Sequence, residues 1–409
     1  MMGSLTSSPS VTATTVLTPF DMIRITDDQR RRRLLRRHLL TPDARVDDPV
    51  AAADAVVALH SSDPASVYLS AAIRLVSPSV ETVATALHQD RSLLRHHAMR
   101  RTLWVMSHDV ARSANAAFGR KVAAAERRRS ATLLGVDADW IDDGIERVVA
   151  VVEAHPPSMT TQEVGRELPD LAEKRDVAGG TIAPHSRLLL QAAFEGRIIR
   201  TRPKGSWIGS QYAWAATASW SDIDWTTPSV HEGAIDMVHR WLDRFGPGTV
   251  DDLVWWTGST RTLVRGALDA IDTVEVELDD GSTGLVLADD TDEPEPTDDV
   301  VPSVVLLPAL DPTVMGWKER GWYLAPELVP SVTDRSNNVG PTVWVDGRVV
   351  GGWAMRSDGS IAHDAPLPDR AGTAFDEAAD RIRSIVGDAR PGVRFPSRDQ
   401  RDLLSGRRR

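Results

Sequence analysis

The chain has 409 residues, no cysteine and a formal net charge of −11 at pH 7. Its composition, 42% hydrophobic and 26% charged, is typical of a globular protein with two to four domains, and no apolar run of about 18 residues marks a membrane span. The lack of cysteine excludes disulfides, thiolate nucleophiles and cysteine-based zinc sites. It fits the cytoplasmic location, associated with the nucleoid, that we predict.

The charge is unevenly distributed. Residues 91–130 hold ten Lys/Arg against two Asp/Glu, and residues 30–37 are a second basic cluster. Residues 271–300 hold twelve acidic residues and no Lys or Arg. An acidic chain with basic N-terminal faces can bind a polyanion locally, although a solvated helix face is the simpler interpretation of any single charge run.

The first part of the chain predicts a flexible Ser/Thr-rich tail over residues 1–20 and a looser, mainly helical unit over residues 21–140. Apolar spacing predicts helices over 27–40, 49–59, 64–75 and 79–89, a strand over 102–106, and a helix from Ser107 to about Arg129. We interpret this unit as the first and least regular copy of an architecture that recurs further along.

Residues 141–228 show that architecture clearly. A capping-box pattern at Thr160 and Glu163 starts a short middle helix, and Gly196 follows a third helix where a C-terminal cap belongs. The predicted elements are helices over 142–154, 162–168 and 183–195 and strands over 197–202 and 206–215. Three helices followed by a hairpin indicate a winged helix-turn-helix.

The same order recurs over residues 229–290, with a second capping box at Thr249 and Asp252 and a third helix opened by Ser259. The predicted elements are helices over 230–245, 251–257 and 260–271 and strands over 274–278 and 283–288. An acidic, proline-containing linker is predicted over 291–302. Residues 303–409 predict a β-rich domain with a terminal helix over 373–386.

Four stretches carry a resemblance to a known family: LLRHHAMRRTLWVMSHD, RWLDRFGPGTVDDLVWWTGST, LLPALDPTVMGWKER and DRSNNVGPTVWVDGRVVGGW. They resemble the bacterial winged-helix family that contains DNA glycosylases acting on alkylated bases and on interstrand cross-links, over roughly residues 35–353. The resemblance implies three tandem winged helices and a C-terminal β-barrel. The predicted fold class is therefore α+β, mainly α, with three winged helix-turn-helix units before a small β-barrel-like domain.

The resemblance also implies a position for the catalytic motif. The family's glycosylases carry two glutamines flanking one residue, directly before Asp-Pro. In this chain the three positions are His60, Ser61 and Ser62, followed by Asp63–Pro64. The usual glutamine pair is absent, so whether the chain is an enzyme stays open at this point.

The replacement residues are chemically competent. A purine alkylated at N7 is already a good leaving group, so an enzyme must mainly orient a water and stabilise an oxocarbenium-like sugar. A neutral His60 could orient that water, and Asp63 could polarise it or stabilise the sugar. Ser61 or Ser62 could hold the water or a phosphate. The alternative is structural: Ser62 or Asp63 caps the next helix, with Pro64 at its first position, and His60 ends the previous helix half-buried.

Basic residues around the first and second units are the candidates for DNA contacts, which would position the duplex through its phosphates. They are His96, His97, Arg100, Arg101, Arg187, Arg197, Arg200, Arg202 and Lys204. Solvated surface is the competing interpretation for each. His96 and His97 are not read as metal ligands, because neighbouring side chains point apart and no paired ligand spacing is present. No Gly-rich phosphate loop precedes a helix, so we expect neither a metal nor a cofactor.

Three functions remain in competition. The first is a monomeric, monofunctional glycosylase-like repair protein acting on damaged double-stranded DNA, which is the interpretation we favour. The second is a non-catalytic DNA-binding protein or regulator. Against it, the third helix, residues 183–195, is mostly apolar and offers few side chains that could read bases. The third is a scaffold for small molecules or proteins, favoured by the acidic third wing, which should repel DNA.

Overall fold

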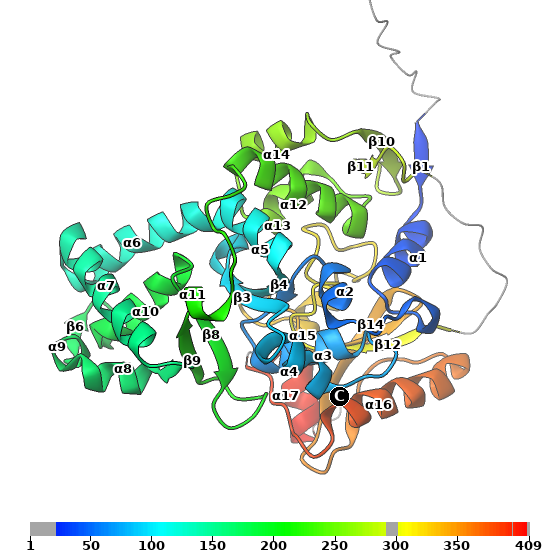
Figure 1. Cartoon of the computed structure of the whole chain (residues 1–409). Helices are drawn as coiled ribbons and strands as arrows, with labels where there is room; N and C mark the ends of the chain where they lie inside the picture. Colours follow the sequence, from blue (N-terminus) through cyan, green and yellow to red (C-terminus); the bar gives the residue numbers. More distant parts are fainter. Residues whose placement is uncertain (1–21, 292–301, 395, 407–409) are drawn as a thin grey trace, which may run out of the picture.

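The computed structural model describes residues 22–291, 302–394 and 396–406. It is an α+β fold with more helix than strand, as predicted. The predicted tail and most of the predicted acidic linker lie outside the described residues. Figure 1 shows one lobe built by the elements from α6 (Arg120–Leu134) to β9 (Tyr212–Ala216) and a larger lobe built by the remaining elements.

The N-terminal unit places a three-stranded antiparallel sheet, in the order β2-β4-β3, among short helices. Its elements are α1 (Asp27–Arg37), η1 (Pro42–Ala44), α2 (Pro49–Asp54), β2 (Leu59–His60), α3 (Pro64–Ala72), α4 (Val80–His88), β3 (Leu93–His97), η2 (Met99–Arg101) and β4 (Leu103–Ser107). The helix predicted over 49–59 is wrong in its second half. It ends at Asp54, the chain turns at Val57 with φ 60°, and His60 pairs with Trp104 as a strand residue.

The helix predicted from Ser107 is present but longer and irregular. It runs through α5 (His108–Ala114), a π-helical stretch η3 (Asn115–Gly119) and α6. Ser107 stands at the cap position, yet its hydroxyl donates to the Asp54 carboxylate at 2.7 Å instead of capping the helix.

The second unit has a hydrophobic core of its own, formed by residues between Leu134 and Trp214. The capping box is confirmed: the Thr160 hydroxyl accepts from the Glu163 amide, and the Glu163 carboxylate accepts from the Thr160 amide. The unit contains α7 (Ala138–Ala154), β5 (Met159–Thr160), α8 (Thr161–Glu167), α9 (Pro169–Ala172), β6 (Arg175–Val177), β7 (Gly180–Ile182), α10 (Pro184–Phe194), β8 (Ile198–Pro203), β9 and α11 (Thr217–Trp220). The predicted hairpin is β8–β9; the small β6–β7 hairpin was not predicted.

The third unit repeats the order of three helices and a hairpin, but it shares one core with the N-terminal and C-terminal parts. It contains α12 (Val230–Phe245), α13 (Val250–Thr257), α14 (Arg261–Leu268), β10 (Thr273–Leu278) and β11 (Thr283–Leu287). The second capping box is confirmed at Thr249 and Asp252, whereas α14 is capped by Thr260 and not by Ser259. A short N-terminal strand, β1 (Ile23–Ile25), pairs in parallel with β10.

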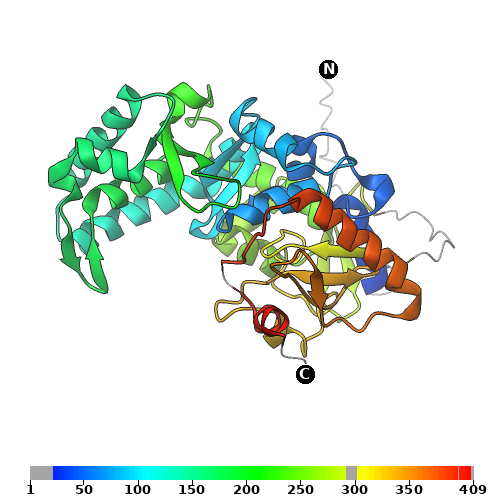
Figure 2. The same cartoon turned by 90° about the horizontal axis from the view of Figure 1, so that it is seen from below.

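The C-terminal part contains a four-stranded antiparallel sheet in the order β12-β13-β14-β15. Its elements are β12 (Val304–Leu307), α15 (Val329–Val332), β13 (Thr342–Val345), β14 (Arg348–Met355), β15 (Ile361–His363), η4 (Asp369–Ala371), α16 (Gly372–Val386) and α17 (Arg398–Ser405). Figure 2 shows α16, the predicted terminal helix, lying beside this sheet. The closed barrel, the winged-helix assignment of the three units and the domain boundaries stay predictions.

A buried ion pair joins the first and last parts of the chain. The Arg74 guanidinium, on the turn after α3, donates two parallel hydrogen bonds to the Asp311 carboxylate, each at 2.9 Å, and neither side chain is exposed. Thr313 accepts from Arg74 and contacts the buried His38 ring. The stretch LLPALDP, one of those that carry the family resemblance, is therefore fixed against the helices of the N-terminal unit.

None of the helices within residues 22–291, 302–394 and 396–406 combines the length and the apolar character needed to cross a membrane.

Candidate functional site

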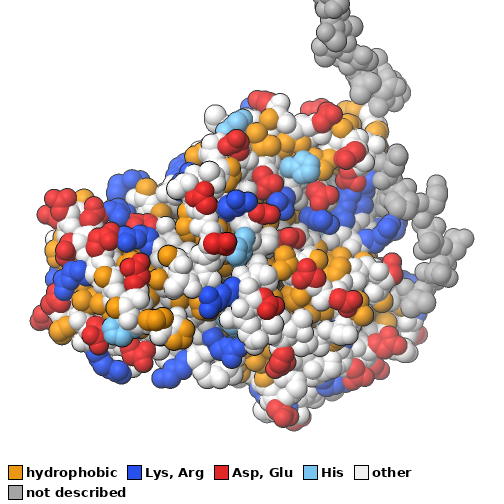
Figure 3. All heavy atoms as spheres, in the orientation of Figure 1, with side chains coloured by type: hydrophobic (Ala, Val, Ile, Leu, Met, Phe, Trp, Pro, Cys, Tyr) orange, Lys and Arg blue, Asp and Glu red, His pale blue; other side chains and the backbone are white. Residues whose placement is uncertain are grey.

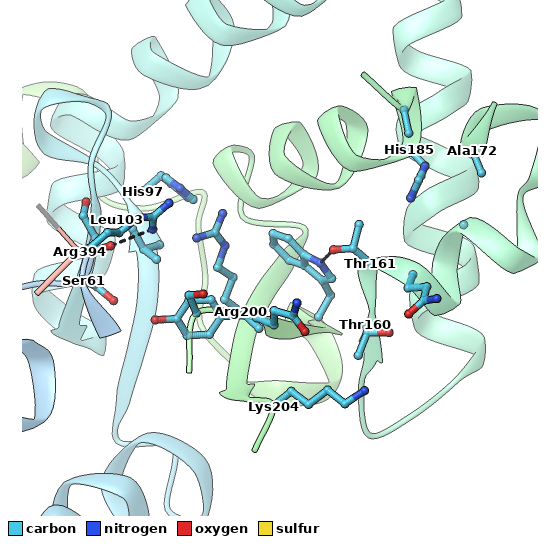
Figure 4. A pocket seen from close by; sticks show the side chains of 18 of the residues that line it. Ser61, His97, Leu103, Thr160, Thr161, Ala172, His185, Arg200, Lys204 and Arg394 are labelled. Carbon is cyan, nitrogen blue, oxygen red and sulfur yellow. Dashed lines mark hydrogen bonds between the residues drawn. The ribbon is translucent and has the colours of Figure 1, made fainter. Parts of the chain in front are cut away.

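A cavity of about 1020 Å³ lies between the N-terminal sheet and the second unit. One wall comes from the β2–α3 connection, β3 and β4, and the other from α8, the start of α10 and the β8–β9 hairpin. Figure 4 shows Ser61, His97, Leu103 and Arg394 on one side and Thr160, Thr161, Ala172 and His185 on the other, with Arg200 between them. Residues far apart in the sequence thus face one space.

The lining of the cavity is strongly basic. It contains six Lys/Arg side chains and no Asp or Glu: Arg101, Arg166, Lys174, Arg200, Lys204 and Arg394. On the face in Figure 3, basic side chains also lie along the boundary between the two lobes. In a chain of net charge −11, this lining is a local positive field, and a concave surface of one charge sign attracts a polyanion.

His60 lies behind the cavity wall and not in its lining. It is 5% exposed, and its ring meets the Trp104 ring edge-on at 4.9 Å between centroids. Burial, with a smaller contribution from the positive charge of Arg100, lowers the pKa of His60 to about 3. The imidazole is therefore neutral at physiological pH, and its Nδ1 lies 3.4 Å from the Ser62 amide that donates to it.

Asp63 is the N-cap of α3, so it caps the helix that begins at Pro64, as the structural alternative predicted. One carboxylate oxygen accepts from the Ala65 amide at 3.0 Å, and the other accepts from the backbone amide of Arg394, also at 3.0 Å. Burial raises the pKa of Asp63, while these two amide donors oppose the shift. The carboxylate thus connects the corner to the C-terminal segment.

Ser61 and Ser62 are the residues of the motif that reach the cavity. Burial raises the pKa of the Tyr212 phenol, and the nearby Ser61 hydroxyl opposes this shift only weakly. Both hydroxyls are buried, and neither has a partner with normal hydrogen-bond geometry. The Ser62 carbonyl accepts from the Arg394 guanidinium at 3.2 Å. The corner therefore presents two hydroxyl-bearing side chains to the cavity, with His60 and Asp63 as buried supports.

Of the predicted DNA contacts, the structure brings four into the lining: His97, Arg101, Arg200 and Lys204. His97 is buried against Phe194, with ring centroids 4.2 Å apart. Arg101 is half exposed and forms an ion pair with Glu126 at 2.7 Å. Arg200 lies over the Tyr212 and Trp214 rings.

The other five lie elsewhere. Arg100 packs over Trp255 at 4.4 Å, and His96 stacks on the Trp225 ring and bonds to Asn115 at 3.0 Å. Arg202 is exposed on β8, outside the lining. The remaining two are held by carboxylates, Arg187 by Glu126 and Arg197 by Glu146.

Sequence reasoning missed several lining residues: Arg166, Lys174, Tyr212, Trp214 and Arg394. A basic residue on α8 and aromatic residues on β9 were available as signals, since clustered basic and aromatic side chains commonly contact nucleic acid. Arg394 carried no such signal, because it reaches the corner from 331 residues along the chain.

No group of three or more His, Cys, Asp or Glu side chains suited to a metal ion exists in the part of the chain that the structure describes.

Buried histidines make the fold sensitive to acid. Burial lowers the pKa of His38 and His60 to about 3 and that of His96 to about 4. These folded-state pKa values lie below the unfolded value near 6.5, so the folded state is fully stable above that pH and loses stability as the pH falls. For each ring, we expect the unfolding free energy to fall by on the order of 2 kcal/mol between pH 7 and pH 5.

Urea unfolding of the native protein and of His60→Gln at the two pH values tests this expectation. The variant should lose less stability than the native protein on acidification, because one buried base has been removed. Equal losses in the two proteins would show that His60 does not resist protonation in the folded state.

Comparison with known proteins shows the family of the chain. The family model described as "DNA glycosylase AlkZ-like" matches residues 53–385, so the chain belongs to the AlkZ-like DNA glycosylase family. The resemblance seen in the sequence is thereby confirmed, and membership makes this a DNA-glycosylase-like repair protein with DNA as its partner.

Among solved structures, the Streptomyces sahachiroi DNA glycosylase AlkZ superposes with a TM-score of 0.70 at 22% identity, covering 91% of this chain and 100% of that chain. At this identity the match shows a shared fold. No curated protein sequence matches the chain.

Proposed function

We propose that this protein is a monofunctional DNA glycosylase that, as a monomer, releases N7-alkylated purines or cross-linked bases from duplex DNA. The observation that carries the proposal is the position of Ser61 and Ser62. They lie at positions that the sequence resemblance assigns to the family's catalytic motif, and they line a cavity with six basic side chains and no carboxylate. The reaction site and the surface suited to the DNA backbone are thus one continuous space.

The DNA-binding half of the proposal rests on the charge and on the architecture. Three helices followed by a hairpin occur in the second and third units, and we interpret them as winged helices, with β8–β9 as the wing beside the cavity. Arg200 and Lys204 on this hairpin, with Arg101 opposite, would meet phosphates. Such contacts position the duplex without reading its sequence, as a repair protein requires.

The catalytic half rests on the corner. Alkylation at N7 places positive charge on the purine, so the bond to the sugar breaks with little assistance, and the remaining tasks are to orient a water and to stabilise the sugar cation. The Ser62 hydroxyl, which can accept and donate, would hold the water. The buried Asp63 carboxylate would stabilise the sugar cation electrostatically, and neutral His60 would keep the corner in place.

The test is a single-turnover reaction with a duplex that carries one N7-methylguanine, followed by detection of the free base. We expect release from this duplex above the spontaneous rate and none from the same duplex with guanine. A second duplex with an N7-linked interstrand cross-link tests the wider substrate range.

The non-catalytic alternative has one observation in its favour, the loss of both glutamines of the motif. It predicts tight binding of the lesion duplex with base release no faster than in buffer. That outcome would assign the protein to damage recognition without excision.

A further inference from the structure

One end of the cavity holds a cluster of buried polar atoms that lack hydrogen-bond partners. The cluster lies beside the Ser61–Ser62 corner, where the β8–β9 hairpin meets β3. Three of its atoms belong to lining residues: the Ser61 hydroxyl, the Tyr212 hydroxyl and Nε of Arg200. The other two, Nε and Nη2 of Arg95, belong to a residue behind the lining. An unpaired buried polar group destabilises the folded chain, and a charged one does so more strongly, so several in one place favour a bound ligand.

The two guanidinium groups of this cluster are close to each other and share an aromatic ring. The Cζ of Arg95 lies 5.1 Å from the centre of the Tyr212 ring, and that of Arg200 lies 5.6 Å from the same ring. Arg95 is 3% exposed, and its one hydrogen bond within the described residues goes to the Thr201 carbonyl at 3.4 Å. Neither arginine forms an ion pair with a described carboxylate.

Arg200 has positively charged neighbours. Burial is the main cause that lowers the pKa of Arg200 to about 10. Tyr212 opposes this shift, and the charges of Arg95 and Arg394 add smaller lowering contributions. Three guanidinium groups therefore repel one another at this point of the wall. A bound anion would relieve this repulsion and accept hydrogen bonds from the N–H groups of Arg95 and Arg200 that lack partners.

Other buried arginines of this chain are paired. Arg74, which is fully buried, forms a bidentate ion pair with Asp311, and Arg187 donates to the buried Glu126. Desolvating an arginine without a carboxylate is costly, so this fold avoids it at those positions. Arg95 and Arg200 lack such a carboxylate partner among the described residues, and both lie over one ring, that of Tyr212.

We propose that this end of the cavity is a binding site for one phosphodiester group of the DNA strand, the phosphate next to the nucleotide that reacts at the Ser61–Ser62 corner. The Arg200 guanidinium binds the phosphate oxygens from the wall, and Arg95 supplies positive charge from behind. The hydroxyls of Ser61 and Tyr212 donate to the same group. The C-terminal segment completes the site with Arg394, whose backbone amide is fixed by Asp63.

A phosphodiester fits these donors well. Planar guanidinium groups bind phosphate oxygens in pairs, and hydroxyl donors complete a tetrahedral anion. Because the site adjoins the corner, it would hold the backbone of the target nucleotide and so place its sugar against the bound water. This inference rests on the proposed function, but it concerns binding and can be measured without base release.

The first experiment measures the dissociation constant for a duplex with one tetrahydrofuran abasic-site analogue, which has no base to release. Single linkages near the analogue are replaced in turn by a neutral methylphosphonate. For the native protein, one neutral linkage beside the analogue should weaken binding about tenfold. Arg200→Gln should weaken binding to the unmodified backbone by a similar factor and add nothing when that linkage is neutral.

The control is Arg91→Gln. Arg91 also lies over an aromatic ring, that of Trp220 at 4.3 Å, but it is outside the cavity lining. The dissociation constant of this variant for the duplex should stay within about twofold of the native value. If Arg200→Gln weakens binding equally whichever linkage is neutral, or not at all, the phosphodiester site is refuted.

The second experiment uses inorganic phosphate without DNA and measures the thermal midpoint of the full chain. Phosphate should raise the midpoint of the native protein, and the rise should be absent in Arg200→Lys and reduced in Tyr212→Phe, because ligand that binds only the folded state stabilises it. An equal rise in all three proteins would show general surface binding and contradict the site. If the rise in the thermal midpoint depends on Arg200 but no neutral linkage weakens DNA binding, the site binds a free phosphate and not DNA.

Discussion

Replacing Ser62 with alanine should slow base release roughly 100-fold in single-turnover reactions, with little change in DNA affinity. Ser62 lines the cavity at the position of the family's second glutamine, and its hydroxyl is the group that we propose to orient the attacking water. Alanine keeps the backbone, so the Ser62 carbonyl still accepts from Arg394. The substitution therefore removes the hydroxyl and leaves the corner folded.

The matched control is Ser66→Ala. Ser66 is a buried serine of α3 that does not line the main cavity, so its substitution should leave the release rate unchanged. A rate that is unaffected in Ser62→Ala would move the water away from this corner, and equal losses in both variants would indicate damage to α3.

His60 provides a second control because it lies behind the wall. With a pKa lowered to about 3, the imidazole does not titrate between pH 5 and pH 8, so the release rate should show no inflection from His60 in that range. An inflection near pH 6.5 that disappears in His60→Gln would instead make His60 a general base in contact with solvent.

Replacing Asp311 with alanine should lower the unfolding free energy by about 3–5 kcal/mol, because it leaves the Arg74 charge buried without a partner. Burial acts to raise the pKa of Asp311, but the charge and hydrogen bonds of Arg74 outweigh it, and the pKa is lowered. Asp311 also accepts from the Thr313 amide at 2.9 Å. Urea denaturation at pH 7 measures the loss.

Two further variants separate the ion pair from other effects of the substitution. The double variant Arg74→Met and Asp311→Leu should recover most of the stability, because the buried charge is removed with its partner. Asp170→Asn breaks the exposed pair with Arg147 and should have no measurable effect. If Asp311→Ala is no less stable than the native protein, water has taken the place of the carboxylate beside Arg74.

Local sequence signals predicted most helices well, since they depend on nearest neighbours along the chain. The capping boxes at Thr160 and Thr249 start helices as expected, and the helix over 230–245 has the predicted bounds. These devices satisfy amide groups within one turn, so no tertiary partner is needed. The failure at residues 55–60 has the opposite cause, because pairing with β4 overrides the local helical pattern.

The site was predictable only in part. The family resemblance predicted a site at residues 60–63, of which Ser61 and Ser62 line the cavity. Basic clustering also pointed to Arg101, Arg200 and Lys204, which line it as well. The sequence did not show that His60 faces away from the cavity while Ser61 and Ser62 reach it. In a two-residue strand, the direction of each side chain depends on the partner strand and on the rings packed against it.

The sequence by itself determined the family and the repeated order of helices and hairpins, because each is encoded in short stretches of residues. The position of the altered motif stays a prediction. Only the tertiary structure decided which arginines are held by carboxylates and which are not. Arg187 and Arg197 meet Glu126 and Glu146, whereas Arg200 meets Arg95 and aromatic rings. Charge pairing depends on distance in space, and that distance is set by how the second unit packs against the N-terminal sheet.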